Sequence, residues 1–465
     1  MELSETLGHV ASAEHLFYDA NGRPQRMPSD NDAHSAPSGL KDGAQATGQI
    51  SRVPDAHGLL TGKDRLPGFT GEWVRVALGD VATLIKGKGL KKDDLVHDGK
   101  SKCIHYGELY GRHGVQVRKI VNRTNFRGSV LSKRNDVLMP SVGVILHRAT
   151  CLMEDDVILG DAIIRIRPNR DDLNGTFLAY CIRASEEQIM RMATGSAFPN
   201  IYPRNMERFE FLMPSRQEQD AIVGVLSDFD DLISGLDDLI TKKSRIKDGA
   251  VHGLLSGDLR IDGFHEAWGA PVALGDVATL TKGASLSKKD VERGGEARCV
   301  HSGELYGGHG PLITNITSRT QHFMGETISK KNDVLLPRSG HPLHLASCLM
   351  EDGVIEAGNF FIIRPDSKDI SGIFLAYCIR ASEEQINNFA RGDFQTLYAT
   401  DVVKFNFPLP PRREQDAIVD VLMDMDSELL SLKSKRARIA DVQIGLMQEL
   451  LFGRIRQRRP ENEAQ

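Results

Sequence analysis

A run of basic side chains in the first third of the chain has the residue types that bind phosphate. Between Leu109 and Asn135 there are several Lys and Arg residues and no Asp or Glu. They are Arg112, Arg118, Lys119, Arg123, Arg127, Lys133 and Arg134, interleaved with Asn122, Asn125 and Phe126. Positive charge without a counter-charge favours contact with a nucleic-acid backbone, and Arg and Asn also hydrogen-bond to base edges. The alternative interpretation is a solvated loop.

Cysteine and histidine side chains form a second candidate site. Cys103, His105 and His113 have the ligand types of a zinc site. The same pattern recurs 196 residues later as Cys299, His301 and His309. Neither set has an obvious fourth ligand, and the Gly-Glu-Leu-Tyr between the histidines recurs equally faithfully, as core and turn residues do. We therefore predict no metal site.

Motifs of catalysis are absent from the sequence. There is no phosphate-binding G-x-x-x-x-G-K-[ST] loop, no G-x-S-x-G, no H-E-x-x-H and no Asn/Asp-Pro-Pro-aromatic motif of methyltransferases. Gly87 and Gly89 lie in a basic turn that is too short for a dinucleotide fingerprint. We expect a binding protein without a cofactor.

The elements that hold these residues occur twice. Ala77–Leu84 recurs unchanged at 273–280, and Phe177–Ile189 recurs unchanged at 374–386. The six cysteines also fall into repeated positions, so duplication explains them better than disulfides. Short apolar runs at Asp136–Met139 and Ala162–Ile166 predict strands, and Asn174–Met192 predicts a helix. Each copy is expected to be an α+β domain.

Two long apolar stripes follow the two domains. Steps of three and four residues predict a coiled-coil seam in each. In the first stripe the seam residues are Ile222, Leu226, Phe229, Ile233, Leu236 and Ile240, and in the second they are Ile418, Leu422, Met425, Leu429, Leu432 and Ile439. The first helix carries the chain to the second domain and the second helix must return. We therefore predict an antiparallel coiled coil and a pseudo-two-fold symmetric molecule.

Length and composition agree with more than one domain. The chain has 465 residues and a net charge of −5. Residues 71–210 carry 22 Lys and Arg against 17 Asp and Glu, whereas residues 265–410 carry 14 against 17, so only the first half is basic. The sequence has no apolar run of membrane-spanning length and no signal-peptide core. We expect a cytoplasmic protein that contacts no membrane.

The sequence predicts seven segments. They are a disordered extension (1–50), a remnant of a helix tail (51–65), a first globular domain (66–213), a central long helix (214–257), a second globular domain (258–409), a C-terminal long helix (410–456) and a tail (457–465).

Several of these segments carry motifs that resemble a known family. Four segments resemble signatures of the specificity subunit of type I restriction-modification systems. Two are the openings of the long helices, Arg216-Gln217-Glu218-Gln219 and Pro410-Pro411-Arg412-Arg413-Glu414-Gln415. The other two are Leu59-Leu60-Thr61-Gly62-Lys63 and Leu66-Pro67-Gly68-Phe69. With the duplication, the resemblance covers about 66–456. It implies a non-catalytic protein whose two target recognition domains bind a split double-stranded DNA target. The implied partners are two adenine-methyltransferase subunits and ATP-dependent restriction subunits.

We expect the residues that contact bases to lie in the segments where the two copies differ. They are 115–134 against 311–331, 141–148 against 338–344, and 197–205 against 393–401. The predicted DNA-binding residues are Lys86, Lys88, Arg112, Arg118, Lys119, Arg123, Asn125, Arg127, Arg148, Asn200, Arg204, Lys282, Asn315, Arg319, Gln321, Arg338, His341 and Gln395.

Two other functions remain open at this point. One is a single-chain DNA-modifying enzyme with an unrecognised active site, which methyl transfer by the purified chain would indicate. The other is a coiled-coil scaffold without a DNA role, which failure to bind any duplex at any salt concentration would indicate.

Overall fold

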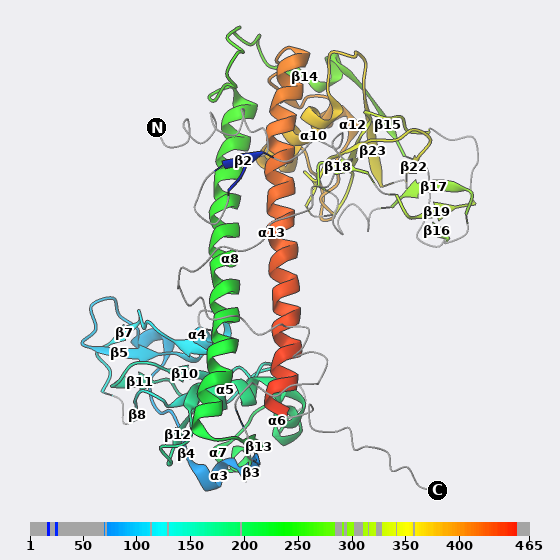
Figure 1. Cartoon of the computed structure of the whole chain (residues 1–465). Coiled ribbons are helices and arrows are strands. Elements are labelled where there is room, and N and C mark those ends of the chain that lie inside the picture. The colour runs from blue at the N-terminus through cyan, green and yellow to red at the C-terminus, as the bar shows by residue number, and fades with distance from the viewer. Residues whose placement is uncertain are drawn as a thin grey trace, which may run out of the picture. The chain divides into compact units, whose positions relative to one another are not determined.

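The computed structural model describes residues 16–18, 24–26, 69, 72–111, 114–127, 130–195, 198–283, 291–292, 295–301, 310–314, 316–321, 328–340, 342–356 and 359–452. These residues form two compact units. The first unit comprises residues 42–239 and 432–465, and the second comprises residues 1–41 and 240–431. Each unit therefore contains one duplicated globular domain and a part of each long helix (Figure 1).

The globular domain of the first unit is built on two β-sheets. Their strand orders are β4-β12-β9-β10-β6 and β7-β5-β11-β8. The strands of the domain are β3 (Val74–Ala77), β4 (Ala82–Lys86), β5 (Ser101–Ile104), β6 (Gln116–Val117), β7 (Arg123–Thr124), β8 (Leu131–Ser132), β9 (Val137–Pro140), β10 (Thr150–Leu152), β11 (Val157–Leu159), β12 (Ile163–Pro168) and β13 (Glu210–Met213). The helices are α3 (Leu78–Val81), the 3-10 helix η1 (Lys92–Asp94), α4 (Tyr106–Gly111), α5 (Gly175–Ala184), α6 (Glu186–Met192) and α7 (Pro203–Met206).

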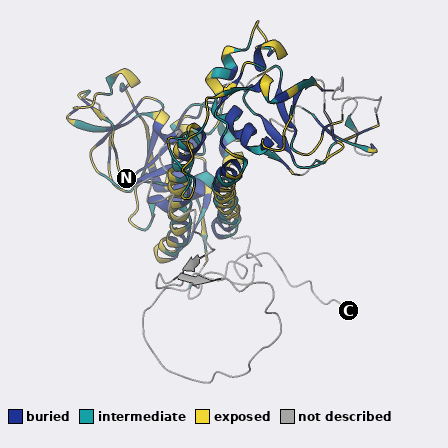
Figure 2. Ribbon diagram, turned by 90° about the horizontal axis from the view of Figure 1, so that it is seen from above, coloured by how far each residue is buried: buried dark blue, intermediate teal, exposed yellow. Residues whose placement is uncertain are grey.

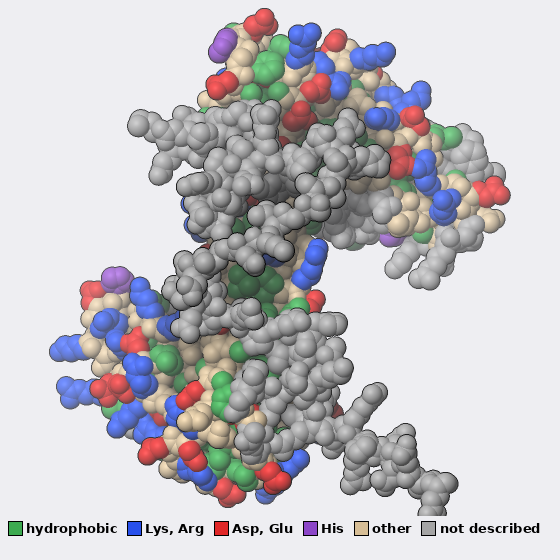
Figure 3. Space-filling view, in the orientation of Figure 1, with side chains coloured by type: hydrophobic (Ala, Val, Ile, Leu, Met, Phe, Trp, Pro, Cys, Tyr) green, Lys and Arg blue, Asp and Glu red, His purple; other side chains and the backbone are tan. Residues whose placement is uncertain are grey.

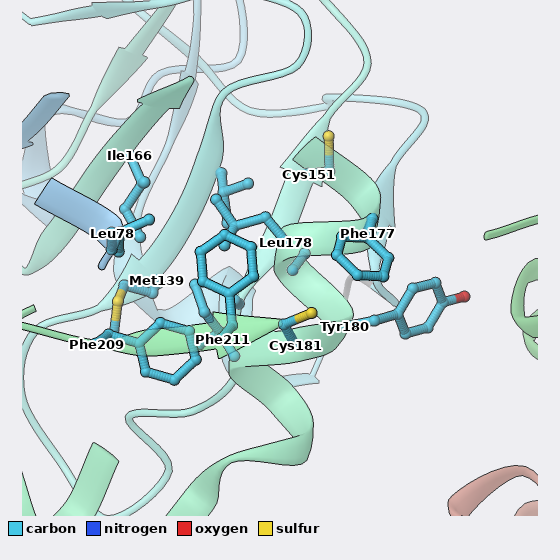
Figure 4. Packing of buried hydrophobic residues seen from close by; sticks show 14 of the residues in the cluster. Leu78, Met139, Cys151, Ile166, Phe177, Leu178, Tyr180, Cys181, Phe209 and Phe211 are labelled. Carbon is cyan, nitrogen blue, oxygen red and sulfur yellow. The ribbon is translucent and has the colours of Figure 1, made fainter. Parts of the chain in front are cut away.

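Both faces of the five-stranded sheet are buried, which explains why its central strands are apolar throughout. On β9, Val137 and Met139 point into the cluster that contains α5, whereas Leu138 belongs to a separate cluster. This alternation is the two-residue period of a strand. Figure 4 shows Phe177 and Leu178 of α5 in the first of these clusters.

The globular domain of the second unit repeats this topology. Its sheets have the orders β15-β23-β20-β21-β18 and β16-β19-β17-β22. The strands are β14 (Val272–Ala273), β15 (Ala278–Lys282), β16 (Val291–Glu292), β17 (Ala297–Val300), β18 (Leu312–Ile313), β19 (Arg319–Thr320), β20 (Val334–Pro337), β21 (Ser347–Leu349), β22 (Ile355–Glu356), β23 (Phe360–Pro365) and β24 (Asn406–Phe407). The helices are the 3-10 helix η2 (Leu274–Asp276), α10 (Gly372–Ala381), α11 (Glu383–Asn388) and α12 (Ala399–Val402).

The two long helices pair in opposite directions within each unit. They are α8 (Arg216–Ser256) and α13 (Arg412–Phe452), of 41 residues each. In the first unit the Gln443 side chain donates to the Leu226 carbonyl oxygen (3.3 Å), and in the second unit Lys243 pairs with Glu428 (2.8 Å). Because the end of α13 meets the start of α8, the predicted antiparallel pairing is confirmed.

The predicted seam residues face inward along both helices. Those that are buried are Ile222, Leu226, Leu236, Ile418, Leu422 and Leu429, and those that are half-buried are Phe229, Ile233, Ile240, Met425, Leu432 and Ile439. In Figure 2 both long helices also carry exposed residues, as expected for amphipathic helices that cover a domain on one side only.

Three local predictions need comment. The helix expected over 174–192 is two helices, because Ser185 leaves the helical conformation (φ −111°, ψ 38°) and its hydroxyl bonds to the Cys181 carbonyl oxygen. Within 1–50, where no element was expected, β1 (Leu16–Tyr18) and β2 (Pro24–Arg26) pair antiparallel. The segments predicted at 51–65 and 457–465 lie outside the described residues.

The described helices include none with the length and hydropathy required to span a bilayer.

Candidate nucleic-acid interface

The motif that opens each long helix fastens that helix to its own domain. The side-chain oxygen of Gln219 accepts from the Asn174 backbone N–H (2.9 Å), and its side-chain NH2 group donates to the backbone carbonyl oxygens of Asp172 and Pro214 (both 2.9 Å). The equivalent glutamine in the second unit, Gln415, makes the corresponding three bonds to Ser371, Asp369 and Pro410. The repeated motif is therefore structural, and its buried amide has partners for its donors and its acceptor.

A glutamate in the same motif holds the strand that enters each domain. The Trp73 indole N–H donates to Glu218 (3.1 Å), and the Trp268 indole N–H donates to Glu414 (2.9 Å). Glu414 also forms a two-bond pair with Arg260 (2.7 and 3.0 Å). Both carboxylates are buried, so these bonds provide the partners that a buried charge requires.

A carboxylate on a long helix joins the domain to the opposite helix in both units. In the first unit Asp230 of α8 accepts from the Tyr180 hydroxyl (2.6 Å) and from the Gln443 amide of α13 (2.8 Å). Burial, followed by the charge of Asp230, raises the pKa of Tyr180 far above its ordinary value. The hydroxyl therefore stays a donor. In the second unit Asp426 of α13 accepts from Tyr377 (2.7 Å) and from Lys247 of α8.

The loops that differ between the copies meet at one end of the five-stranded sheet. In the first domain we call the end of β4, loop 141–148 and hairpin 193–202 the loop platform. Loop and hairpin are joined by backbone bonds, Ile201 N–H to Ser141 O and Gly143 N–H to Pro199 O (both 2.9 Å). The second domain has a corresponding platform at the end of β15, loop 338–344 and hairpin 390–398, where Leu397 N–H donates to Arg338 O (2.7 Å).

Exposed cations surround a tyrosine on the first platform. Tyr202 is 43% exposed, and the Lys86 ammonium and the Arg204 guanidinium each lie 5.9 Å from its ring centroid. On the second platform the Arg391 guanidinium lies 5.9 Å from the ring of Tyr398 and also pairs with Asp401 (2.5 Å), while 64% of its side chain stays exposed. A cation held over a ring face remains accessible to a second, anionic partner. Both platforms therefore combine positive charge with an accessible aromatic face.

The structure divides the basic run of the sequence between different places. Arg118 follows β6, which runs away from the loop platform at the far edge of the sheet. Its guanidinium forms a two-bond pair with Asp231 of α8 (2.9 and 3.3 Å), so it connects the domain to the helix. Arg123 lies on β7 of the other sheet and donates to Gly99 O (3.4 Å). The basic residues between Leu109 and Asn135 therefore do not form one continuous surface.

Other cations of the run lie at the surface. Lys119 and Arg127 are exposed, whereas the Asn125 side chain accepts from the Lys100 N–H (3.1 Å) and supports a turn. Figure 3 shows Lys and Arg side chains gathered on the side of the first domain that carries β5, β7 and β11 (compare Figure 1). The four-stranded sheet therefore provides a second cationic surface in the first domain.

The remaining predicted residues lie on or beside the platforms. Lys88 and Lys282 are exposed, and Arg148 is half-buried in loop 141–148. Asn200 closes its hairpin by donating to Phe198 O (2.8 Å), and Arg338 lies over the Phe361 ring (5.2 Å).

Three further predicted residues lie in the second domain. Gln395 sits in a turn with φ +45°, Gln321 is exposed, and the Arg319 side chain donates to Glu296 O (3.3 Å). Arg112, Asn315 and His341 lie outside the described residues.

Sequence reasoning missed four aromatic residues on the platforms. These are Phe198 and Tyr202 in the first domain, and Phe394 and Tyr398 in the second. The signal was present, because each Phe and Tyr recurs 196 residues later inside segments that otherwise differ.

The described residues include no group of three His, Cys, Asp or Glu side chains that could hold a metal ion, and His309 lies outside the described residues. Cys103 is buried on β5, and burial raises the pKa of its thiol to about 11. His113 lies outside the described residues. All six cysteines are buried free thiols.

The chain is similar in sequence and fold to known proteins of one kind. The family model for the type I restriction modification DNA specificity domain matches residues 70–242 and 266–439, once for each domain. The type I restriction enzyme MjaVIII specificity subunit of Methanocaldococcus jannaschii is 22% identical over 428 residues, which cover 86% of this chain and 95% of that protein.

Two solved structures share the fold. The crystal structure of the type I restriction-modification S subunit from M. genitalium has a TM-score of 0.55 and 17% identity, and the match covers 83% of this chain and 98% of that one. A structure from work on complex assembly and conformational transition of the type I system has a TM-score of 0.52 and 14% identity, with 82% and 98% covered.

Duplicated α+β domains, each with its cationic loop platform and its antiparallel helix pair, are the architecture of a two-domain DNA-recognition protein. The family model covers most of the chain, so the chain belongs to the type I restriction modification DNA specificity family. It is a type I specificity subunit with two tandem target recognition domains, the recognition component rather than the enzyme.

Proposed function

We propose that each target recognition domain binds one half-site of a bipartite DNA target, with a gap of unread base pairs between the half-sites. The duplicated loop platform is the observation that supports this proposal. The two platforms share one backbone bond between hairpin and loop but differ in side chains, for example Arg204 in one domain and Thr400 in the other. A common frame with different side chains suits two domains that read different bases.

The partners follow from the family. The chain is proposed to hold two adenine-methyltransferase subunits, with ATP-dependent restriction subunits joining that complex, in the cytoplasm where chromosomal DNA is accessible. The relative from M. jannaschii is named as a subunit of a type I restriction enzyme, and one of the similar structures comes from a study of complex assembly in such a system. Both names support a role within a multi-subunit assembly.

Genome-wide mapping of methylated adenines tests the proposed function. The chain is co-expressed with the methyltransferase gene that neighbours its own gene in a host that lacks other adenine methylation. We expect methylation at one motif with two short half-sites in inverted orientation and a fixed gap. Cells with the methyltransferase alone are the control and should lack this motif. A contiguous motif, or methylation that does not depend on this chain, would contradict the proposal.

A further inference from the structure

The tip of the hairpin on each loop platform carries an exposed phenylalanine. Phe198 is 76% exposed and Phe394 is 84% exposed. They are the two most exposed of the large hydrophobic side chains among the described residues. Exposed single apolar residues are common on protein surfaces, so exposure alone assigns no role. In addition, both rings lie on closed hairpins, and the exposed phenylalanine recurs in both domains.

Both hairpins are closed turns that present the ring outward. In the first domain Thr194 and Asn200 exchange two backbone hydrogen bonds (both 2.8 Å), and Gly195 adopts φ +89° between them. In the second domain Arg391 and Thr396 exchange two bonds (3.0 and 2.9 Å), and Gly392 adopts φ +74°. The left-handed conformation suits glycine, which has no Cβ. The backbone thus holds each ring at a defined place.

The recurrence of the ring does not come from a conserved turn. Seven residues lie between Ala193 and Ile201, but six lie between Ala390 and Leu397, so the second hairpin is one residue shorter. The side chains of the turns also differ, yet each keeps Phe at its tip and Tyr four residues later. Other aromatic residues that recur in the two domains, such as Phe177 and Phe374, are buried in the core. A repeated but exposed ring points to a binding partner that both domains meet.

We infer that Phe198 and Phe394 make equivalent apolar contacts with the bases of the two half-sites, an inference that rests on the proposed function. Duplex DNA is favoured as the partner because the platform that carries each ring also holds cations beside its tyrosine, Lys86 and Arg204 in the first domain and Arg391 in the second. Phenylalanine has no donor or acceptor, so it contacts base faces or methyl groups and does not decode hydrogen-bond patterns. The same residue therefore serves two half-sites of different sequence.

The test measures DNA affinity of the complex between the full chain and its co-expressed methyltransferase. The probe is a fluorescent duplex that carries the motif mapped by methylation sequencing. We expect Phe198→Ala and Phe394→Ala each to weaken binding by about 10-fold or more. In the double variant the two factors should multiply, because the residues lie in different domains. The salt dependence of the dissociation constant should stay unchanged, because no phosphate contact is removed.

The controls separate DNA contact from other roles. Val74→Ala removes an exposed apolar side chain on β3 and should leave the DNA affinity unchanged. Phe198→Leu keeps an apolar side chain and should bind DNA more tightly than Phe198→Ala but more weakly than the unmodified complex. If both alanine variants bind DNA as tightly as the unmodified complex, the inference is overturned. Unchanged DNA affinity together with reduced recovery of the methyltransferase would also overturn it and would identify a protein contact. If the unmodified complex fails to bind its own motif, the proposed function itself fails.

Discussion

At the scale of single residues, several of the most informative side chains join parts of the protein. The Tyr180, Asp230 and Gln443 group joins the domain, α8 and α13 in the first unit, and an equivalent group occurs in the second unit. Positions 443 and 247 are equivalent in the duplication, but one is Gln and the other is Lys. The Gln443 amide donates to Asp230, and the Lys247 ammonium donates to the equivalent Asp426. Both groups are hydrogen-bond donors, so either can occupy this position.

Tyr180→Phe should destabilise the protein by about 1.5–3 kcal/mol, because it removes one hydrogen bond to a charged acceptor. The effect should depend on pH. The folded-state pKa of Tyr180 lies above its unfolded value of about 10, so the wild-type contribution is present below pH 10 and is lost as pH rises further. Thermal unfolding of both proteins from pH 7 to pH 11 measures this. An equal fall in melting temperature for both would contradict the buried-hydroxyl account.

The cations of the first domain should divide into two classes. Lys86→Ala and Arg204→Ala should each lower the slope of log Kd against log salt by about 0.9, as loss of one phosphate contact does. Arg118→Ala should leave the slope unchanged, because Asp231 already holds that guanidinium. Binding measured between 50 and 300 mM salt separates the classes. A lower slope for the Arg118 variant alone would show that the basic run, and not the platform, meets the backbone.

At the scale of elements, the sequence predicted the long helices and several strands, but not where the loops meet. The strands expected at 136–139 and 162–166 are β9 and β12, shifted by one or two residues. These follow from local periodicity. The basic run was expected to act together, yet β6 and β7 belong to different sheets. Residues that are close in sequence separate when the chain pairs its strands, and a local pattern does not contain that pairing.

The platform loops should carry the specificity of a half-site. Replacing 338–344 and 393–401 of the second domain with 141–148 and 197–205 of the first should change the second half-site of the methylation motif toward the first. One backbone bond between hairpin and loop, from Ile201 N–H in the first domain and Leu397 N–H in the second, is equivalent, so the transplanted pair keeps this support. An unchanged second half-site in an active protein would place the readers elsewhere, such as on the four-stranded sheet.

At the scale of the whole molecule, both long helices cross from one unit to the other. Residues 216–239 of α8 belong to the first unit and residues 240–256 to the second, and α13 crosses at residues 431 and 432. If the two domains hold one duplex, the length of these helices sets the gap between half-sites. The sequence predicts a pseudo-two-fold axis, and that relation between the units stays a prediction.

The measurement that tests this account most directly is methylation mapping after a heptad is added to both helices, after Leu236 in α8 and after Arg436 in α13. Asp237 pairs with Arg436, so these insertions face each other and preserve the seam. Each helix lengthens by roughly 10 Å, which corresponds to at most about three base pairs. We expect both half-sites to stay the same and the gap to grow by up to about three base pairs. An active variant that methylates the original motif with its original gap would contradict the claim that the two domains read one duplex at a distance set by the helices.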